Sequence, residues 1–151
     1  MSLESSFDRF VVDNQRRIWQ SLVPLVGPEA AQDALAEALA RAWTDWPRVS
    51  SMANPSGYVY TVARNEAIRG ERPAPAFALA EPLEAQAEPG LVDALRELTE
   101  MQRQAVYLLD GVGWTLQEVA DHLGVAVSTV RNHRQRGLDR LRRRLKVVSD
   151  A

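Results

Sequence analysis

The chain has 151 residues, 46% of them hydrophobic, and a formal net charge of −2, which suits one ordinary domain or two small ones with packed cores. No cysteine is present, which excludes disulfides, cysteine-based zinc sites and cysteine nucleophiles and fits a reducing cytoplasm. Neither a signal peptide nor an apolar run near the ~20 residues of a membrane helix is recognisable, so we expect a cytoplasmic protein without a membrane span.

The first half of the chain predicts three helices, over residues 5–23, 29–46 and 55–69. Pro24 and then Gly27-Pro28 interrupt the first helical pattern. Pro47 is expected to end the alanine-rich second helix, and residues 48–53 follow as a loop. Asn54-Pro55 is a helix start, because asparagine caps the first amides and proline suits the first helical position.

The second half predicts four more helices, over residues 91–98, 99–110, 116–123 and 128–146. Thr99 and Thr115 are expected to cap the second and third of these, and Ser128 the fourth. Gly111 and Gly113 are expected to end the helix that begins at Thr99.

Between the halves lies a stretch rich in proline, glutamate and alanine, residues 70–90, which has no clear period. This composition is typical of a flexible tether. The predicted fold class is therefore all-α, with two small helical domains at 1–69 and 91–151 joined by an acidic linker at 70–90.

Residues from about 115 to 146 carry the pattern of a helix-turn-helix. Ala120 is small where the two helices must cross, and Gly124 permits the backbone conformation of a sharp turn. Apolar residues at the matching positions are expected to form the shared core: Val119, Leu123, Val125 and Val130.

The second helix of this motif leaves an outer face for base edges, with Thr129, Arg131, Asn132 and Gln135. Arginine suits guanine and asparagine suits adenine. Ser128 lies at the helix start, where exposed amides suit a phosphate. Basic side chains farther along are expected on phosphates, which position the protein without reading sequence: Arg136, Arg140, Arg142, Arg143, Arg144 and Lys146. Arg134 interrupts an apolar stripe, and either reaches a phosphate or shields the core edge.

The charge distribution supports this interpretation. Residues 127–146 contain eight Arg or Lys against Asp139 alone, although the whole chain is nearly neutral. An arginine run by itself favours a merely solvated helix face. Joined to the turn at Gly124 and the spaced apolar residues, it favours DNA binding.

Two segments together resemble a known family. Residues 98–108, the helix-turn-helix and residues 137–145 resemble region four of bacterial sigma factors, and residues 33–43 with 54–65 resemble region two. Their order and spacing are similar to those of the small group-four sigma factors, the extracytoplasmic-function type. The resemblance covers about residues 10–69 and 91–146.

This resemblance implies a dissociable promoter-recognition subunit of RNA polymerase that needs no cofactor. Region two would dock on the β′ clamp helices through one helix face bearing Asp33, Glu37 and Arg41. Region four would read the minus-thirty-five element and contact the β flap. The loop 48–53 and the next helix would melt and read the minus-ten element, with Asn54, Tyr60, Thr61, Arg64 and Asn65 at the DNA. Tyr58 and Trp43 are expected in the core.

Two departures from the family pattern bear on function. A basic cluster usually follows the Ala-Arg-Asn triplet, whereas residues 66–73 here are nearly neutral, which predicts weaker minus-ten contacts. The sequence shows no additional regulatory domain, so we expect no built-in extension. A separate anti-sigma partner is compatible with the sequence, although no residue points to one.

Three other classes compete with this interpretation. An enzyme is disfavoured because His122 and His133, the two histidines, both lie in the helix-turn-helix and no catalytic constellation is recognisable. A plain helix-turn-helix regulator has no reason to carry residues 54–65. A sigma-like decoy that binds polymerase without initiating stays open, because the basic cluster is weak.

Overall fold

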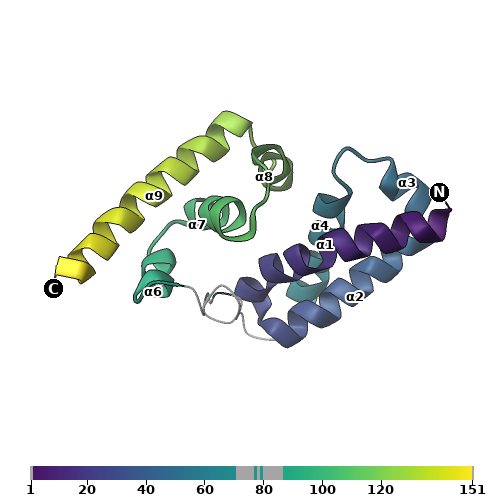
Figure 1. Cartoon of the computed structure of the whole chain (residues 1–151), viewed down its shortest axis with the longest axis horizontal. Coiled ribbons are helices and arrows are strands. Elements are labelled where there is room, and N and C mark those ends of the chain that lie inside the picture. Colours follow the sequence, from purple (N-terminus) through teal and green to yellow (C-terminus); the bar gives the residue numbers. More distant parts are fainter. Residues whose placement is uncertain (1, 71–76, 78, 80–86, 151) are drawn as a thin grey trace. The chain divides into compact units, whose positions relative to one another are not determined.

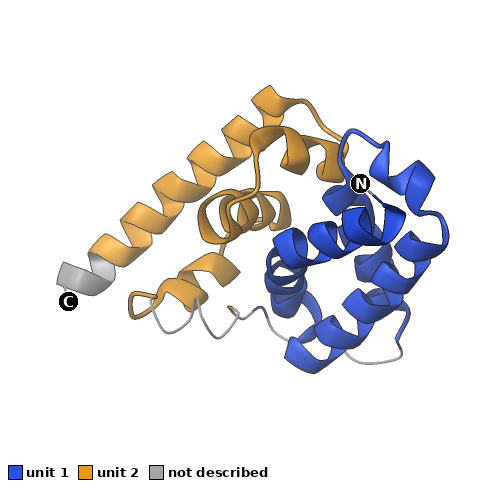
Figure 2. Cartoon of the chain, turned by 45° about the vertical axis from the view of Figure 1, so that its right-hand side comes forward, with its two compact units in different colours: residues 1–78 blue, residues 79–151 orange. Residues whose placement is uncertain are grey.

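The computed structural model describes residues 2–70, 77, 79 and 87–150, the last four by their backbone alone. Every regular element in these described residues is a helix, so the predicted all-α fold class is confirmed. The chain forms two compact units, residues 1–78 and 79–151 (Figure 2). The flexibility expected of the linker concerns mainly residues 71–76, 78 and 80–86, which lie outside the described residues. Within the described part, no helix has both the length and the apolarity needed to cross a membrane.

Unit 1 packs its helices around a core rich in alanine and aliphatic side chains. Its described helices are α1 (Leu3–Val26), α2 (Pro28–Thr44), α3 (Trp46–Ser50) and α4 (Pro55–Arg69) (Figure 1). The long helices α1, α2 and α4 contact one another pairwise. Small residues on α2 permit their close approach, and the buried set includes Ile18, Leu22, Ala31, Leu35, Ala38, Ala42, Val59 and Ala63.

Two expected helix ends in unit 1 are wrong. Pro24 does not end α1, which continues to Val26. The missing proline amide costs one helical hydrogen bond near the end of the helix, but Pro24 is itself buried, and this packing offsets the loss. Pro47 does not end α2 either, because Asp45 already separates α2 from α3, and Pro47 lies in the first turn of α3, where no amide is required. Part of the expected loop 48–53 is therefore helical.

Unit 2 contains the remaining described helices. They are α6 (Leu91–Arg96), α7 (Glu100–Val106), the π-helical turn η1 (Tyr107–Val112), α8 (Leu116–Leu123) and α9 (Val127–Asp150). The helix from Thr99 continues through Gly111, where it has widened into η1, and ends at Gly113. Of the two glycines expected to end it, Gly113 does so and Gly111 does not. Gly137 lets α9 approach α7 closely, because a Cβ atom there would lie 2.8 Å from Val106 Cγ2.

Candidate nucleic-acid interface

The helix-turn-helix forms at α8 and α9 as its turn chemistry predicts. Thr115 begins α8 with a reciprocal capping box: its hydroxyl accepts the Glu118 amide at 3.1 Å, and Glu118 Oε1 accepts the Thr115 amide at 3.0 Å. Gly124 ends α8 in the left-handed conformation, with φ of 69°. Ala120 and Val130 are buried at the crossing. The predicted corner is therefore present.

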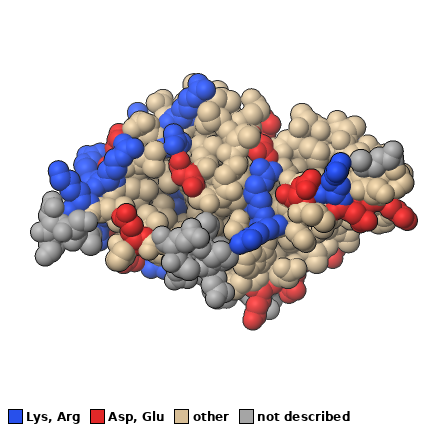
Figure 3. All heavy atoms as spheres, viewed as in Figure 1, with Lys and Arg blue, Asp and Glu red and all other residues tan. Residues whose placement is uncertain are grey.

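One face of α9 packs inward, and the opposite face presents polar side chains to solvent. Val130, Gly137 and Leu141 are buried at helical spacing. Thr129 is half-buried, and the other residues predicted to read bases or contact phosphates at this end are exposed: Ser128, Arg131, Asn132, Gln135 and Arg136. Figure 3 shows Lys and Arg atoms gathered along α9.

Ser128 does not have the predicted cap position. Helix α9 begins at Val127, and the amides of Thr129 and Val130 donate to Ala126 O. Ser128 therefore lies within the first turn. Its hydroxyl remains exposed at the helix N-terminus, where amides point outward.

Several arginines predicted as phosphate contacts also have partners within unit 2. Arg140 donates to Gln102 Oε1 at 3.2 Å, and Arg143 Nε donates to the Asp139 carbonyl at 3.3 Å. Arg144 Nε lies 3.2 Å from a carboxylate oxygen of Glu97. The contacts of Arg140 and Arg144 brace the second half of α9 against the rest of unit 2, whereas that of Arg143 lies within α9.

Arg134 forms the shortest ion pair in the described part of unit 2. Its Nε and Nη2 atoms donate to the two carboxylate oxygens of Asp110 on η1, at 2.9 and 2.7 Å. The Asp110 carboxylate raises the pKa of the Arg134 guanidinium by hydrogen bonding and charge. Of the two roles predicted for Arg134, this geometry favours shielding of the core edge over contact with a phosphate.

In unit 1, helix α4 carries the second predicted DNA surface, and Tyr60 does not belong to it. Tyr60 is only 2% exposed, and burial raises its pKa to about 12. Asn54 caps α4, since its Oδ1 accepts the Gly57 amide at 3.0 Å. Thr61 and Asn65 are exposed, and Arg64 is half-buried. The predicted surface therefore includes Thr61, Arg64 and Asn65 but not Tyr60.

Two aromatic residues expected in the core are partly accessible instead. Trp43 is 42% exposed and packs one side of its ring on Phe7, with ring centroids 5.1 Å apart. Tyr58 is half-buried, and the Arg48 guanidinium lies 5.6 Å above its ring. Arg48 also pairs with Asp45, which raises the Arg48 pKa. Sequence reasoning missed Arg48 because it treated residues 48–53 as a loop, whereas α3 places Arg48 one turn from Asp45.

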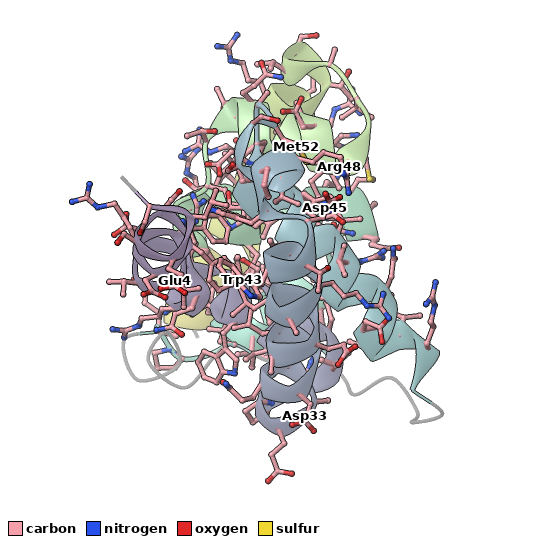
Figure 4. The ribbon with its side chains drawn as sticks, turned by 90° about the vertical axis from the view of Figure 1, so that its right-hand side faces the viewer. Glu4, Asp33, Trp43, Asp45, Arg48 and Met52 are labelled. Carbon is pink, nitrogen blue, oxygen red and sulfur yellow. The ribbon has the colours of Figure 1, made fainter. Side chains whose placement is uncertain are left out.

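The predicted docking face on α2 is exposed as expected. Figure 4 looks onto this helix, with Asp33 towards one end and Trp43 and Asp45 towards the other. Asp33, Glu37 and Arg41 are all exposed. Arg41 Nη2 lies 2.8 Å from Glu66 Oε1 of α4, and Arg41 Nε lies 3.7 Å from Glu37 Oε1. Arg41 therefore ties α2 to α4 besides contributing to the face.

A basic recognition helix in one unit and a polar helix surface in the other define a DNA-binding protein of the helix-turn-helix class. Family models sharpen this class. Residues 10–72 match the model for Sigma-70 region 2, and residues 90–141 match the model for Sigma-70, region 4. No curated protein matches the chain by sequence.

Two solved structures share the fold. One is the sigma factor RpoE in complex with the anti-sigma factor NepR from Bartonella quintana, with a TM-score of 0.69 and 20% identity over 94% of this chain and 98% of that chain. The other is CnrH in complex with the cytosolic domain of CnrY, with a TM-score of 0.66 and 18% identity over 95% of this chain and 90% of that chain.

The chain belongs to the sigma-70 family, as a sigma factor of the extracytoplasmic-function type that acts in transcription initiation. This is a non-enzymatic family, in agreement with the prediction from the sequence. Region two lies in unit 1 and region four in unit 2.

Proposed function

We propose that the outer face of α9 reads the minus-thirty-five element of a promoter. Arg131 and Asn132 carry this proposal, because both are exposed on α9 outside the buried face that holds Val130. Their side chains can form bidentate bonds with guanine and adenine edges. Thr129 and Gln135 flank them. The cations farther along α9, Arg136, Arg140 and Arg143, contact phosphates and set the register on the duplex.

Region two supplies the minus-ten surface. Thr61, Arg64 and Asn65 follow one another around the accessible side of α4, and Asn54 lies at its start. Tyr58 replaces the buried Tyr60 on this surface, since it is partly accessible beneath Arg48. Melting requires bases to be unstacked, and aromatic and guanidinium groups offset that cost by stacking.

Polymerase contacts belong to other surfaces. Asp33 and Glu37 on the exposed face of α2 dock on the β′ clamp helices, with Arg41 beside them. Region four also has an apolar groove of about 300 Å³, bounded in part by Leu91, Leu95 and Leu138. We assign the β flap contact to this groove, because a helix presenting apolar side chains would bury them there.

An anti-sigma protein is a further partner in this proposal. Its support is that both structural neighbours were solved as complexes, RpoE with an anti-sigma factor and CnrH with CnrY. Because polymerase and the promoter are its other partners, the chain acts in the cytoplasm.

Run-off transcription with core polymerase on a promoter selected from randomised DNA tests the promoter assignment. Arg131→Ala should lose sequence discrimination worth about 1–3 kcal/mol for its base pair. Arg143→Ala should weaken binding equally on selected and random DNA and lower the log-log salt slope by about 0.9. Identical behaviour of the two variants on both DNAs would contradict the division into base and phosphate contacts.

Core binding tests the docking face separately. Glu37→Arg should reduce affinity for core polymerase, whereas Asp13→Arg makes the same charge change on an exposed position of α1 and should not. Core binding without any specific transcript would favour a decoy. One observation keeps the decoy open. Glu66 forms ion pairs with Arg41 and Arg69, and these pairs neutralise positive charge near the minus-ten surface that could otherwise attract DNA.

A further inference from the structure

Asp110 and Arg134 join two parts of region four that lie 24 residues apart in sequence. Asp110 belongs to the π-helical turn η1, and Arg134 lies in α9 between the proposed base readers Arg131 and Gln135. The pair is bidentate, with bonds of 2.9 and 2.7 Å. A guanidinium–carboxylate fork fixes the orientation of its two partners as well as their distance.

Arg134 lies on the packing face of α9 and not on its DNA face. It is one helical turn from both Val130 and Gly137, which are buried against α8 and α7. A phosphate contact through Arg134 would require the side chain to leave Asp110 and swing around the helix. The interruption of the apolar stripe at 134 therefore has a reason other than direct DNA binding.

An apolar residue at 134 would pack against the core without fixing the orientation of α9 about its axis. Apolar contacts let a helix roll by a small angle at little cost, because the hydrophobic effect is non-directional. Two other polar contacts of α9 within the described residues, at Arg140 and Arg144, lie on the far side of Gly137 from the base readers. Asp110 is nearer to Arg131 and Asn132 than either of them, and a small roll there turns both side chains directly.

The element that contains Asp110, the π-helical turn η1, is unusual as well. Wide π-helical turns are rare and concentrate at functional sites. Here the turn continues α7 and ends at Gly113, immediately before Trp114 and the α8 cap Thr115. It holds Asp110 at the edge of the helix-turn-helix, where the carboxylate reaches α9.

We propose that the Asp110–Arg134 ion pair is a positioning pair that fixes the rotation of α9 about its axis, and so determines which base edges Arg131 and Asn132 face. The proposal rests on the proposed reading of DNA by α9. Asp110 and Arg134 are 34% and 41% exposed, so the pair contributes little to folding stability, and its effect on reading can be measured apart from unfolding.

The test uses holoenzyme and a selection from randomised promoter DNA, with Asp110→Asn, Arg134→Gln, Asp110→Arg and the reversed pair D110R/R134D. Each single neutral variant should lower the ratio of selected to random DNA affinity by about threefold to tenfold and flatten the base preference in the upstream element. The reversed pair should recover base preference relative to D110R alone. The salt slope should not change.

Arg96→Gln is the matched control. Arg96 pairs with Asp93 within α6, and its side chain is 44% exposed, but it lies outside α9. Its loss should leave base preference intact.

Three results would overturn the proposal. Unchanged base preference in both neutral variants would make the pair an ordinary surface contact. A sequence-independent loss in Arg134→Gln, with a salt slope lower by about 0.9, would make Arg134 a phosphate contact. If Arg131→Ala also leaves base preference unchanged, α9 does not read bases, and the proposed function fails together with the positioning role.

Discussion

Region two and region four both present polar side chains on a helix, but the place of that helix in the fold is determined in different ways. In region four, the Thr115 capping box and Gly124 mark where α8 begins and ends, and these fix where α9 can pack. In region two, α4 begins at a clear Asn54 cap, yet apolar and aromatic residues surround most of the helix. Local turn chemistry therefore determines where the reading helix of region four begins, whereas tertiary packing determines which face of α4 is exposed.

The tyrosines of α4 test this contrast with the largest expected effect. Tyr60→Ala should destabilise region two by about 3–5 kcal/mol, since it removes a side chain that is only 2% exposed. Tyr58→Ala removes the same atoms from a half-buried site and should cost less than about 1.5 kcal/mol. Chemical denaturation of the two variants measures the difference. Equal losses would mean that α4 is rotated from the described orientation.

The sequence predicts the features that local turn chemistry determines, and it does not predict those that depend on tertiary packing. The spans of α4 and α8, the turn at Gly124 and the exposed α9 residues follow from caps, glycine and charge. Tyr60 and Tyr58 were exchanged because they are two positions apart in a helix with apolar residues on several sides, and only the packing against α1 and α2 decides which of them points inward.

Polar partners distant in sequence could not be predicted either. Arg134 was recognised as a break in the apolar stripe, but its partner Asp110 lies in a π-helical turn that no helical period of 3.6 residues reveals. The position of Arg48 is not predicted, because a proline at position 47 favours the end of a helix. In the structure, Pro47 lies at the beginning of α3.

A second, intermediate effect concerns alkaline pH. Burial raises the Tyr60 pKa to about 12 from an ordinary value of 10.0, so the unfolded chain ionises first as the pH rises. The stability associated with the protonated phenol is complete below pH 10.0 and is lost between 10.0 and about 12. Tyr60→Phe should flatten this dependence by up to about 1.4 kcal/mol per pH unit in equilibrium unfolding. Tyr58→Phe is the control, and an unchanged slope in Tyr60→Phe would contradict the assignment.

The smallest effects distinguish a true cap from an apparent one in region four. Thr115→Ala should cost about 1 kcal/mol, because the Glu118 amide loses its acceptor. Ser128→Ala should change stability by no more than about 0.5 kcal/mol, since Ser128 is exposed within the first turn of α9. Thermal unfolding can compare them, and a larger loss in Ser128→Ala would restore the predicted cap position.

Region two and region four are proposed to read two separate promoter elements, and this division underlies the proposed function. Site-specific photo-crosslinking tests it directly, with the crosslinker at position 132 in α9 or at position 61 in α4 of a holoenzyme bound to its promoter. We expect position 132 to crosslink to the minus-thirty-five element and position 61 to the minus-ten element. Crosslinks from both positions to the same element, or none from position 61 in a holoenzyme that initiates, would contradict the account.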